Sequence, residues 1–97
     1  MAVLYIVENP QVTTDFYDKV RARLQDEGPP QGWRFHVAAK GDGGALMVVE
    51  VWESEADREA WGKKLDKAIE ELGGPKRPQP RKYQVHNMLL PEATSRT

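Results

Sequence analysis

The chain's two histidines, His36 and His86, are the side chains best suited to proton transfer. Imidazole is the one group whose unperturbed pKa lies near neutrality, so each histidine is a candidate general base or acid. Both lie in the middle of apolar segments, and the competing interpretation is a structural histidine with satisfied hydrogen bonds. As a metal pair they lack a third ligand at recognisable spacing, so we expect no metal site.

Glu50 is the third catalytic candidate. It interrupts a valine-rich segment, Val48-Val49-Glu50-Val51, that reads as a strand. A carboxylate on a half-buried strand costs free energy unless it is paired. One interpretation is an ion pair, with Arg34 or with a basic group of a partner chain, and the other is a general base.

Three further positions carry two interpretations each. Asn87 could hold a substrate oxygen or take part in strand exchange between subunits. Trp61 could belong to the core or form a wall of a pocket. The basic cluster of Lys76, Arg77, Arg81 and Lys82 could be a solvated loop or the rim of an anion site.

Four strands and two helices position these residues. Periodicity and turn signals predict strands over 3–7, 31–40, 45–53 and 82–90. Thr13 or Thr14 caps the first helix and Ser54 the second, and glycine and proline end both. The βαββαβ order predicts a ferredoxin-like α+β fold, a four-stranded antiparallel sheet with both helices on one face. The two histidines then lie on opposite edge strands, roughly 14 Å apart.

Residues 41–44 (GDGG) predict a hairpin that sets the register of the two central segments. With an even loop, Trp33 faces Trp52, Phe35 faces Glu50 and His36 faces Val49. Strict alternation places Trp33 and Phe35 on one face and His36 on the other.

Two features predict a homodimer. The first and third strands are apolar on both faces, and two helices can cover only one of them. The last predicted strand is nine residues long, so it overhangs the first and could cross toward a partner. A sheet-on-sheet dimer would satisfy both features.

Composition narrows the class of protein. Ninety-seven residues suit one domain, which we place at 1–91, with a flexible tail at 92–97. There is no cysteine and no long apolar run, and the formal charge is −1, so we expect neither a membrane nor a nucleic-acid partner. An RNA-recognition module shares this strand order, but the third strand here is aliphatic and acidic. The N-terminus carries no signal peptide, so we expect a cytoplasmic protein.

Several motifs carry a family resemblance. The stretch Val51-Trp52-Glu53-Ser54, with Trp61 in the following helix, resembles the strand-to-helix signature of antibiotic biosynthesis monooxygenase-like dimeric α+β barrels. The segments 32–36 (GWRFH), 49–54 (VEVWES) and 85–89 (VHNML) are similar to a subset of small bacterial proteins of unassigned function. The resemblance covers residues 1–91 and implies the fold and the dimer.

The resemblance also implies two enzymatic precedents. Some members oxidise aromatic polyketides with oxygen and no cofactor. Others degrade haem with an asparagine after the first strand, a tryptophan on the second helix and a histidine ligand on that helix. Asn9 and Trp61 match the first two positions and are candidate ligand-binding residues, but residues 55–72 contain no histidine. We therefore expect no haem and no other cofactor.

Together these features predict a homodimer that binds a small aromatic or carbonyl compound between sheet and helices. Cofactor-independent monooxygenase-like activity is one form of this function. The alternative is a non-catalytic ligand-binding or structural dimer whose pocket is filled by Phe16, Trp52 and Trp61. An open cavity of roughly several hundred cubic ångströms reaching His36 or His86 would favour a ligand.

Overall fold

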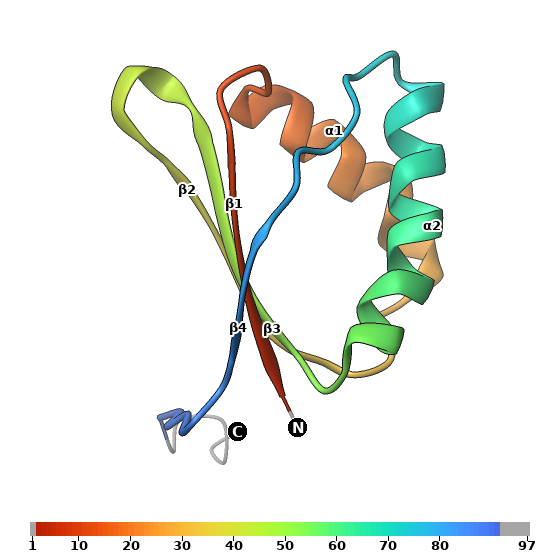
Figure 1. The fold of residues 1–97 in the computed structure, drawn as a ribbon. Helices are drawn as coiled ribbons and strands as arrows, with labels where there is room; N and C mark the ends of the chain where they lie inside the picture. Colours follow the sequence, from red (N-terminus) through yellow and green to blue (C-terminus); the bar gives the residue numbers. More distant parts are fainter. Residues whose placement is uncertain (1, 92–97) are drawn as a thin grey trace.

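The computed structural model describes residues 2–91, and the predicted tail at 92–97 lies outside them. The elements are β1 (Val3–Asn9), α1 (Thr14–Leu24), η1 (Gln25–Glu27), β2 (Trp33–Lys40), η2 (Asp42–Gly44), β3 (Leu46–Trp52), α2 (Glu55–Glu71) and β4 (Arg81–Gln84). All strand pairs are antiparallel, in the order β2-β3-β1-β4, and both helices cover the same face (Figure 1). This is the ferredoxin-like α+β fold that the element order predicts.

The two helices begin at the predicted hydroxyl caps. Thr13 Oγ1 accepts the backbone N–H of Phe16 at 3.1 Å, and Ser54 Oγ accepts that of Asp57 at 3.1 Å. Each bond satisfies a first-turn donor that the helix itself leaves free. Within residues 2–91, neither helix has the length and apolar character that crossing a bilayer would require.

The core forms where the helices meet the sheet. One cluster joins Val3, Tyr5 and Trp52 on the sheet, and another joins Val20, Leu24 and Ala68 on the helices. Trp61 packs against both clusters. The indole of Trp61 therefore connects the two layers, as the core interpretation of this residue requires.

A β-bulge at Arg34 changes the predicted faces of β2. Trp33 pairs with Trp52 as expected, but Phe35 then pairs with Val51 and His36 with Glu50. The predicted pairs Phe35–Glu50 and His36–Val49 are wrong because the bulge adds one residue and reverses the alternation beyond it. Trp33 and His36 consequently share the face that the helices cover, and Phe35 lies on the other face.

The last strand is shorter than predicted. Residues 82–90 were expected to form it, whereas β4 ends at Gln84. Its neighbour β1 begins at Val3, and beyond the strand the backbone N–H of Val85 donates to Ala2 C=O at 3.0 Å. The segment 85–90 instead turns to the face opposite the helices (Figure 1), where it lines a cavity with Leu4, Phe35 and Val51.

Removal of this segment should leave the chain unable to fold in soluble form. A chain ending at Gln84 uncovers Val51, which is 4% exposed in the intact protein, together with the apolar residues around it. Each buried aliphatic side chain is worth about 1.5–3 kcal/mol, a large part of the stability of a domain this small. Solubility and thermal unfolding by circular dichroism measure the effect. A chain ending at Pro91 is the control and should unfold as the full chain does; a soluble, cooperatively folding chain ending at Gln84 would contradict the prediction.

Candidate functional site

A cavity of about 130 Å³ lies between the sheet and the two helices; we call it the helix-side cavity. Aromatic side chains contribute much of its lining: Phe16, Tyr17, Trp33, Trp52 and Trp61. The helices α1 and α2 add the aliphatic side chains Val20, Leu24, Leu65 and Ile69. The cavity reaches His36 and is smaller than the several hundred cubic ångströms that we set as favouring a ligand. The cavity on the opposite face of the sheet, which reaches His86, has that size, at about 470 Å³. The volume of the helix-side cavity is close to the ~150 Å³ of a cavity that binds benzene in another protein.

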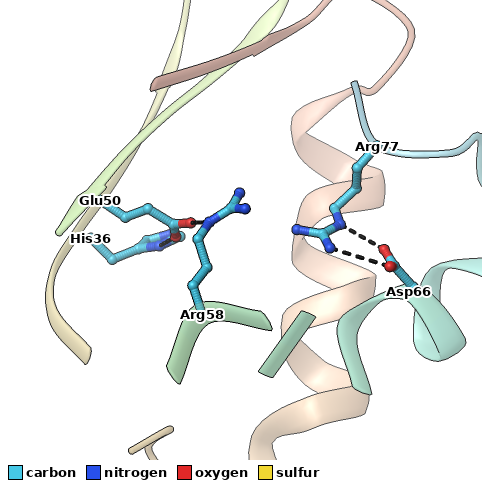
Figure 2. Close-up of polar contacts among 5 residues, drawn as sticks. All are labelled: His36, Glu50, Arg58, Asp66 and Arg77. Atoms are coloured by element: carbon cyan, nitrogen blue, oxygen red, sulfur yellow. Dashed lines mark hydrogen bonds and ion pairs between the residues drawn. The ribbon is translucent and has the colours of Figure 1, made fainter. Parts of the chain in front are cut away.

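Four side chains form a hydrogen-bonded chain at the wall of the cavity, hereafter the polar chain. Tyr17 Oη lies 2.6 Å from His36 Nε2, and His36 Nδ1 lies 3.1 Å from Glu50 Oε1. Arg58 Nε donates to Glu50 Oε2 at 3.0 Å, as Figure 2 shows. The side chains of His36, Glu50 and Arg58 are 18%, 12% and 15% exposed, so the chain is largely shielded from water.

The ionised state of Glu50 orients every proton in the polar chain. A carboxylate can only accept, so His36 Nδ1 carries the proton that it shares with Glu50. When the imidazole carries only this proton, its Nε2 lone pair accepts the hydroxyl of Tyr17. Carboxylate, imidazole and hydroxyl in this order are the groups that allow a histidine to act as a base while the acid stabilises the imidazolium.

Opposing effects set the pKa of Glu50. Burial favours the neutral acid, but hydrogen bonds from His36 and Arg58 hold the pKa of Glu50 below its ordinary value. The carboxylate therefore stays ionised near neutral pH. Burial, reinforced by the Glu50 charge, raises the pKa of Tyr17, although Arg21 opposes the effect. Tyr17 thus remains a hydroxyl donor.

Aromatic rings hold the polar chain in place. The ring of Trp33 meets His36 edge-on, with centroids 5.9 Å apart, and the guanidinium of Arg58 lies 4.1 Å from the centroid of Tyr5. Trp52 is 1% exposed, and its indole Nε1–H finds no hydrogen-bond acceptor among the described residues. This buried donor leaves one hydrogen bond unfilled in the wall of the cavity.

Arg77 enters the same cavity from the connector between α2 and β4. Its Nε donates to Asp66 Oδ1 at 2.6 Å and its Nη2 to Asp66 Oδ2 at 3.2 Å. Of the basic cluster considered above, Arg81 instead pairs with Glu8 and Lys82 with Glu55 at exposed positions. The solvated-loop interpretation therefore does not hold for Arg77, whose side chain is 26% exposed.

The structure brings together some of the predicted site residues and separates others. His36, Glu50, Asn9 and Trp61 all line the helix-side cavity. Asn9 is 8% exposed, and its side-chain oxygen accepts the backbone N–H of Gln11. His86 and Asn87 line the cavity on the opposite face of the sheet, so within one chain the two histidines do not meet.

Two residues of the polar chain, Tyr17 and Arg58, were not singled out from the sequence. Arg58 is the partner of Glu50, whereas Arg34 pairs with Glu53 at the surface, so the expected Arg34–Glu50 pair is wrong. Arg34 is the bulged residue, and the shift in register separates it from Glu50. In the sequence, the one signal that Arg58 carries is its position four residues after the Ser54 cap.

Within residues 2–91, no group of three or more acidic or histidine side chains is arranged to hold a metal ion. The sequence supplies no cysteine ligand either.

Solved structures of similar fold support the resemblance seen in the sequence. A conserved protein of Methanosarcina mazei matches with a TM-score of 0.65 and 16% identity over 87% of this chain and 92% of its own. A candidate antibiotic biosynthesis monooxygenase of Chloroflexus aurantiacus matches with a TM-score of 0.63 and 15% identity, over 91% of this chain and 97% of its own. A monooxygenase of Streptomyces coelicolor, solved with the ligand nanaomycin D, matches with a TM-score of 0.58 and 18% identity, over 93% of this chain and 92% of its own.

No family model matches the chain, and no curated protein does. At these identities the structural matches establish the fold. The chain therefore has the fold of the antibiotic biosynthesis monooxygenase-like proteins, as its motifs predict.

We expect the free energy of unfolding to fall in acid as Glu50 becomes protonated. Because folding lowers its pKa, the contribution of Glu50 is fully present above its ordinary pKa of 4.5 and is lost as the pH falls through the lower, folded-state value. Glu50→Gln should remove that part of the acid dependence. It should also lower the free energy of unfolding at pH 7 by about 1–3 kcal/mol, because Arg58 loses its charged partner. Urea unfolding at several pH values measures both effects.

Glu53→Gln is the matched control, since Glu53 also pairs with an arginine but is 54% exposed. Its effect should stay within about 0.5 kcal/mol. Equal effects of the two substitutions would show that the buried pair has no special importance.

Proposed function

We propose that this protein binds a small aromatic or carbonyl compound in the helix-side cavity and transfers a proton from it. The observation that carries the proposal is the Tyr17–His36–Glu50 arrangement, which ends with a tyrosine hydroxyl at an aromatic-lined cavity. The proton transfers in a relay through these groups balance. Tyr17 passes its proton to His36 Nε2 and takes the ligand's proton in return, and Glu50 stabilises the imidazolium.

The second step of the proposal is cofactor-independent monooxygenase-like chemistry. A deprotonated phenol is electron-rich and can react with dioxygen directly. A phenol that takes up one dioxygen becomes a quinone and one water, so the balance requires no external reductant. The Streptomyces coelicolor monooxygenase, which shares the fold, supports this class of reaction, and the cavity volume favours ligands of about one ring.

One observation favours the alternative of a non-catalytic binding or structural protein. Both ring nitrogens of His36 already have partners within the chain, Tyr17 and Glu50. In this alternative, His36 holds β2, β3 and α1 together through these two hydrogen bonds and takes no part in catalysis. The two functions differ in what replacement of His36 does to turnover as opposed to stability.

The proposed working form is a homodimer whose sheets pack through the faces opposite the helices. The apolar side chains on this surface include Val37, which is 44% exposed, and those of the C-terminal segment include Leu89 at 85% and Leu90 at 46%. Exposed leucines of this kind next to an apolar cavity are typical of a surface that another chain covers. Contacts within one chain leave these side chains exposed, and a second copy offers the same apolar surface in return.

Replacement of His36 tests the proposed chemistry. With single-ring phenols as substrates, the wild type should consume oxygen, and His36→Gln should lower the rate by about 10²–10⁴-fold, the usual contribution of a general base. Tyr17→Phe should also lower the rate, because the relay then lacks the hydroxyl that passes a proton between the ligand and His36. An oxygen electrode records the rates.

His86→Gln is the matched control, because His86 lies on the other face of the sheet and should leave the rate unchanged. Phenol binding without oxygen uptake in the wild type would favour the non-catalytic alternative. Absence of both would refute the proposed function.

Sedimentation tests the dimer. We expect a dimer at micromolar concentration that buries about 2,000 Å² or more in total, as stable homodimers do. Leu89→Glu should dissociate it without unfolding the monomer, because this side chain is 85% exposed within one chain. Lys67→Glu, an exposed charge reversal on α2, is the control and should sediment as the wild type does. A monomeric wild type would defeat the proposal.

A further inference from the structure

The charged side chains that line the helix-side cavity are mostly arginines. The lining contains three arginines, Arg21, Arg58 and Arg77, but only one carboxylate, Glu50. The whole chain, by contrast, carries a formal charge of −1. Asp66, which holds Arg77, offsets only part of this excess. A cavity with a local excess of positive charge attracts anions and concentrates them from solution.

Two of these arginines hold unused donors toward the same space. Arg58 bonds Glu50 only through Nε, and among the described residues its two terminal nitrogens have no hydrogen-bond acceptor. Arg77 bonds Asp66 through Nε and Nη2, which leaves its Nη1 without an acceptor in the same part of the chain. Figure 2 shows the two guanidinium groups turned toward one another from opposite sides.

The position of Arg77 depends on a glycine in α2. A Cβ built on Gly62 would lie 2.8 Å from Arg77 Nη2, which is too close for two unbonded atoms. Arg58, Gly62 and Asp66 follow one another at four-residue spacing, so they form one stripe along the helix. Because Gly62 has no side chain, it leaves a gap in this stripe that admits the guanidinium of Arg77. A glycine inside a helix lowers the helix propensity in return.

We infer that Arg58 and Arg77 together bind the carboxylate of the ligand, so that the ligand class is a one-ring aromatic carboxylate. Two like charges that face each other in a shielded cavity repel, and an anion between them removes that repulsion. Guanidinium groups bind carboxylates in a bidentate, planar manner that matches the free nitrogens described above. The ring would then lie among the aromatic and aliphatic side chains of the cavity, next to Tyr17.

This inference rests on the proposed function for the site, and it adds the charge of the ligand. Benzoate, benzyl alcohol and acetate are the probes: a ring with a carboxylate, a ring without one and a carboxylate without a ring. Isothermal titration of the full chain at neutral pH should show benzoate binding at least about 10-fold more tightly than either of the others, as one charge-assisted hydrogen bond would give.

Two variants test the role of Arg77 by different routes. Arg77→Gln removes the charge, and Gly62→Ala displaces the guanidinium while improving the propensity of α2. Both should reduce the preference for benzoate over benzyl alcohol to about 2-fold or less, and both should remain folded by circular dichroism. Arg81→Gln is the matched control, because Arg81 begins β4 directly after that connector but pairs with Glu8 at the surface.

The outcomes separate this inference from the proposed function. Benzyl alcohol bound as tightly as benzoate would overturn the carboxylate inference and leave the aromatic cavity intact. Acetate bound as tightly as benzoate, or an equal loss in Arg81→Gln, would show that surface charge is responsible and overturn the inference as well. If none of the three probes binds, the inference fails, and oxygen uptake with phenols then decides the proposed function separately.

Discussion

Glu50 is a carboxylate in a sheet that is otherwise apolar at this point, and its need for partners organises the site. Its two oxygens are held by His36 of β2 and Arg58 of α2, so one side chain of β3 ties together an edge strand and a helix. A buried charge left without either partner would cost several times the value of an ordinary hydrogen bond. The bulge at Arg34 serves the same requirement, because it brings His36 opposite Glu50.

The same contacts that stabilise Glu50 also orient His36 for the proton transfer that we propose. An ionised Glu50 fixes which ring nitrogen of His36 carries the proton, and Tyr17 keeps its own proton because burial raises its pKa. Stability and the proposed reactivity therefore depend on the same three residues. This is why the useful experiments compare turnover with stability and pair each buried group with an exposed counterpart.

The two faces of the sheet are occupied in different ways. On the helix side, Trp61 joins the two core clusters and leaves a cavity about the size of one ring. On the other side, the segment 85–90 and the central strands form a second, apolar surface of which Leu89 is the most exposed part. The fold thus separates the shielded cavity, where we propose that a small ligand binds, from the apolar surface that we propose for the dimer.

The sequence by itself determined the order of the elements, the sheet topology, the helix caps and the importance of Glu50 and His36, because these follow from local periodicity, turn residues and the cost of an unpaired charge. The shape of the site was decided only by the tertiary structure. A single bulge reversed the faces of β2 beyond Trp33, and nothing in the local pattern of alternation announces it. Arg58, Tyr17 and Arg77 reach the cavity because two helices and a connector pack over one sheet face. That packing is a property of the whole chain, and no short segment encodes it.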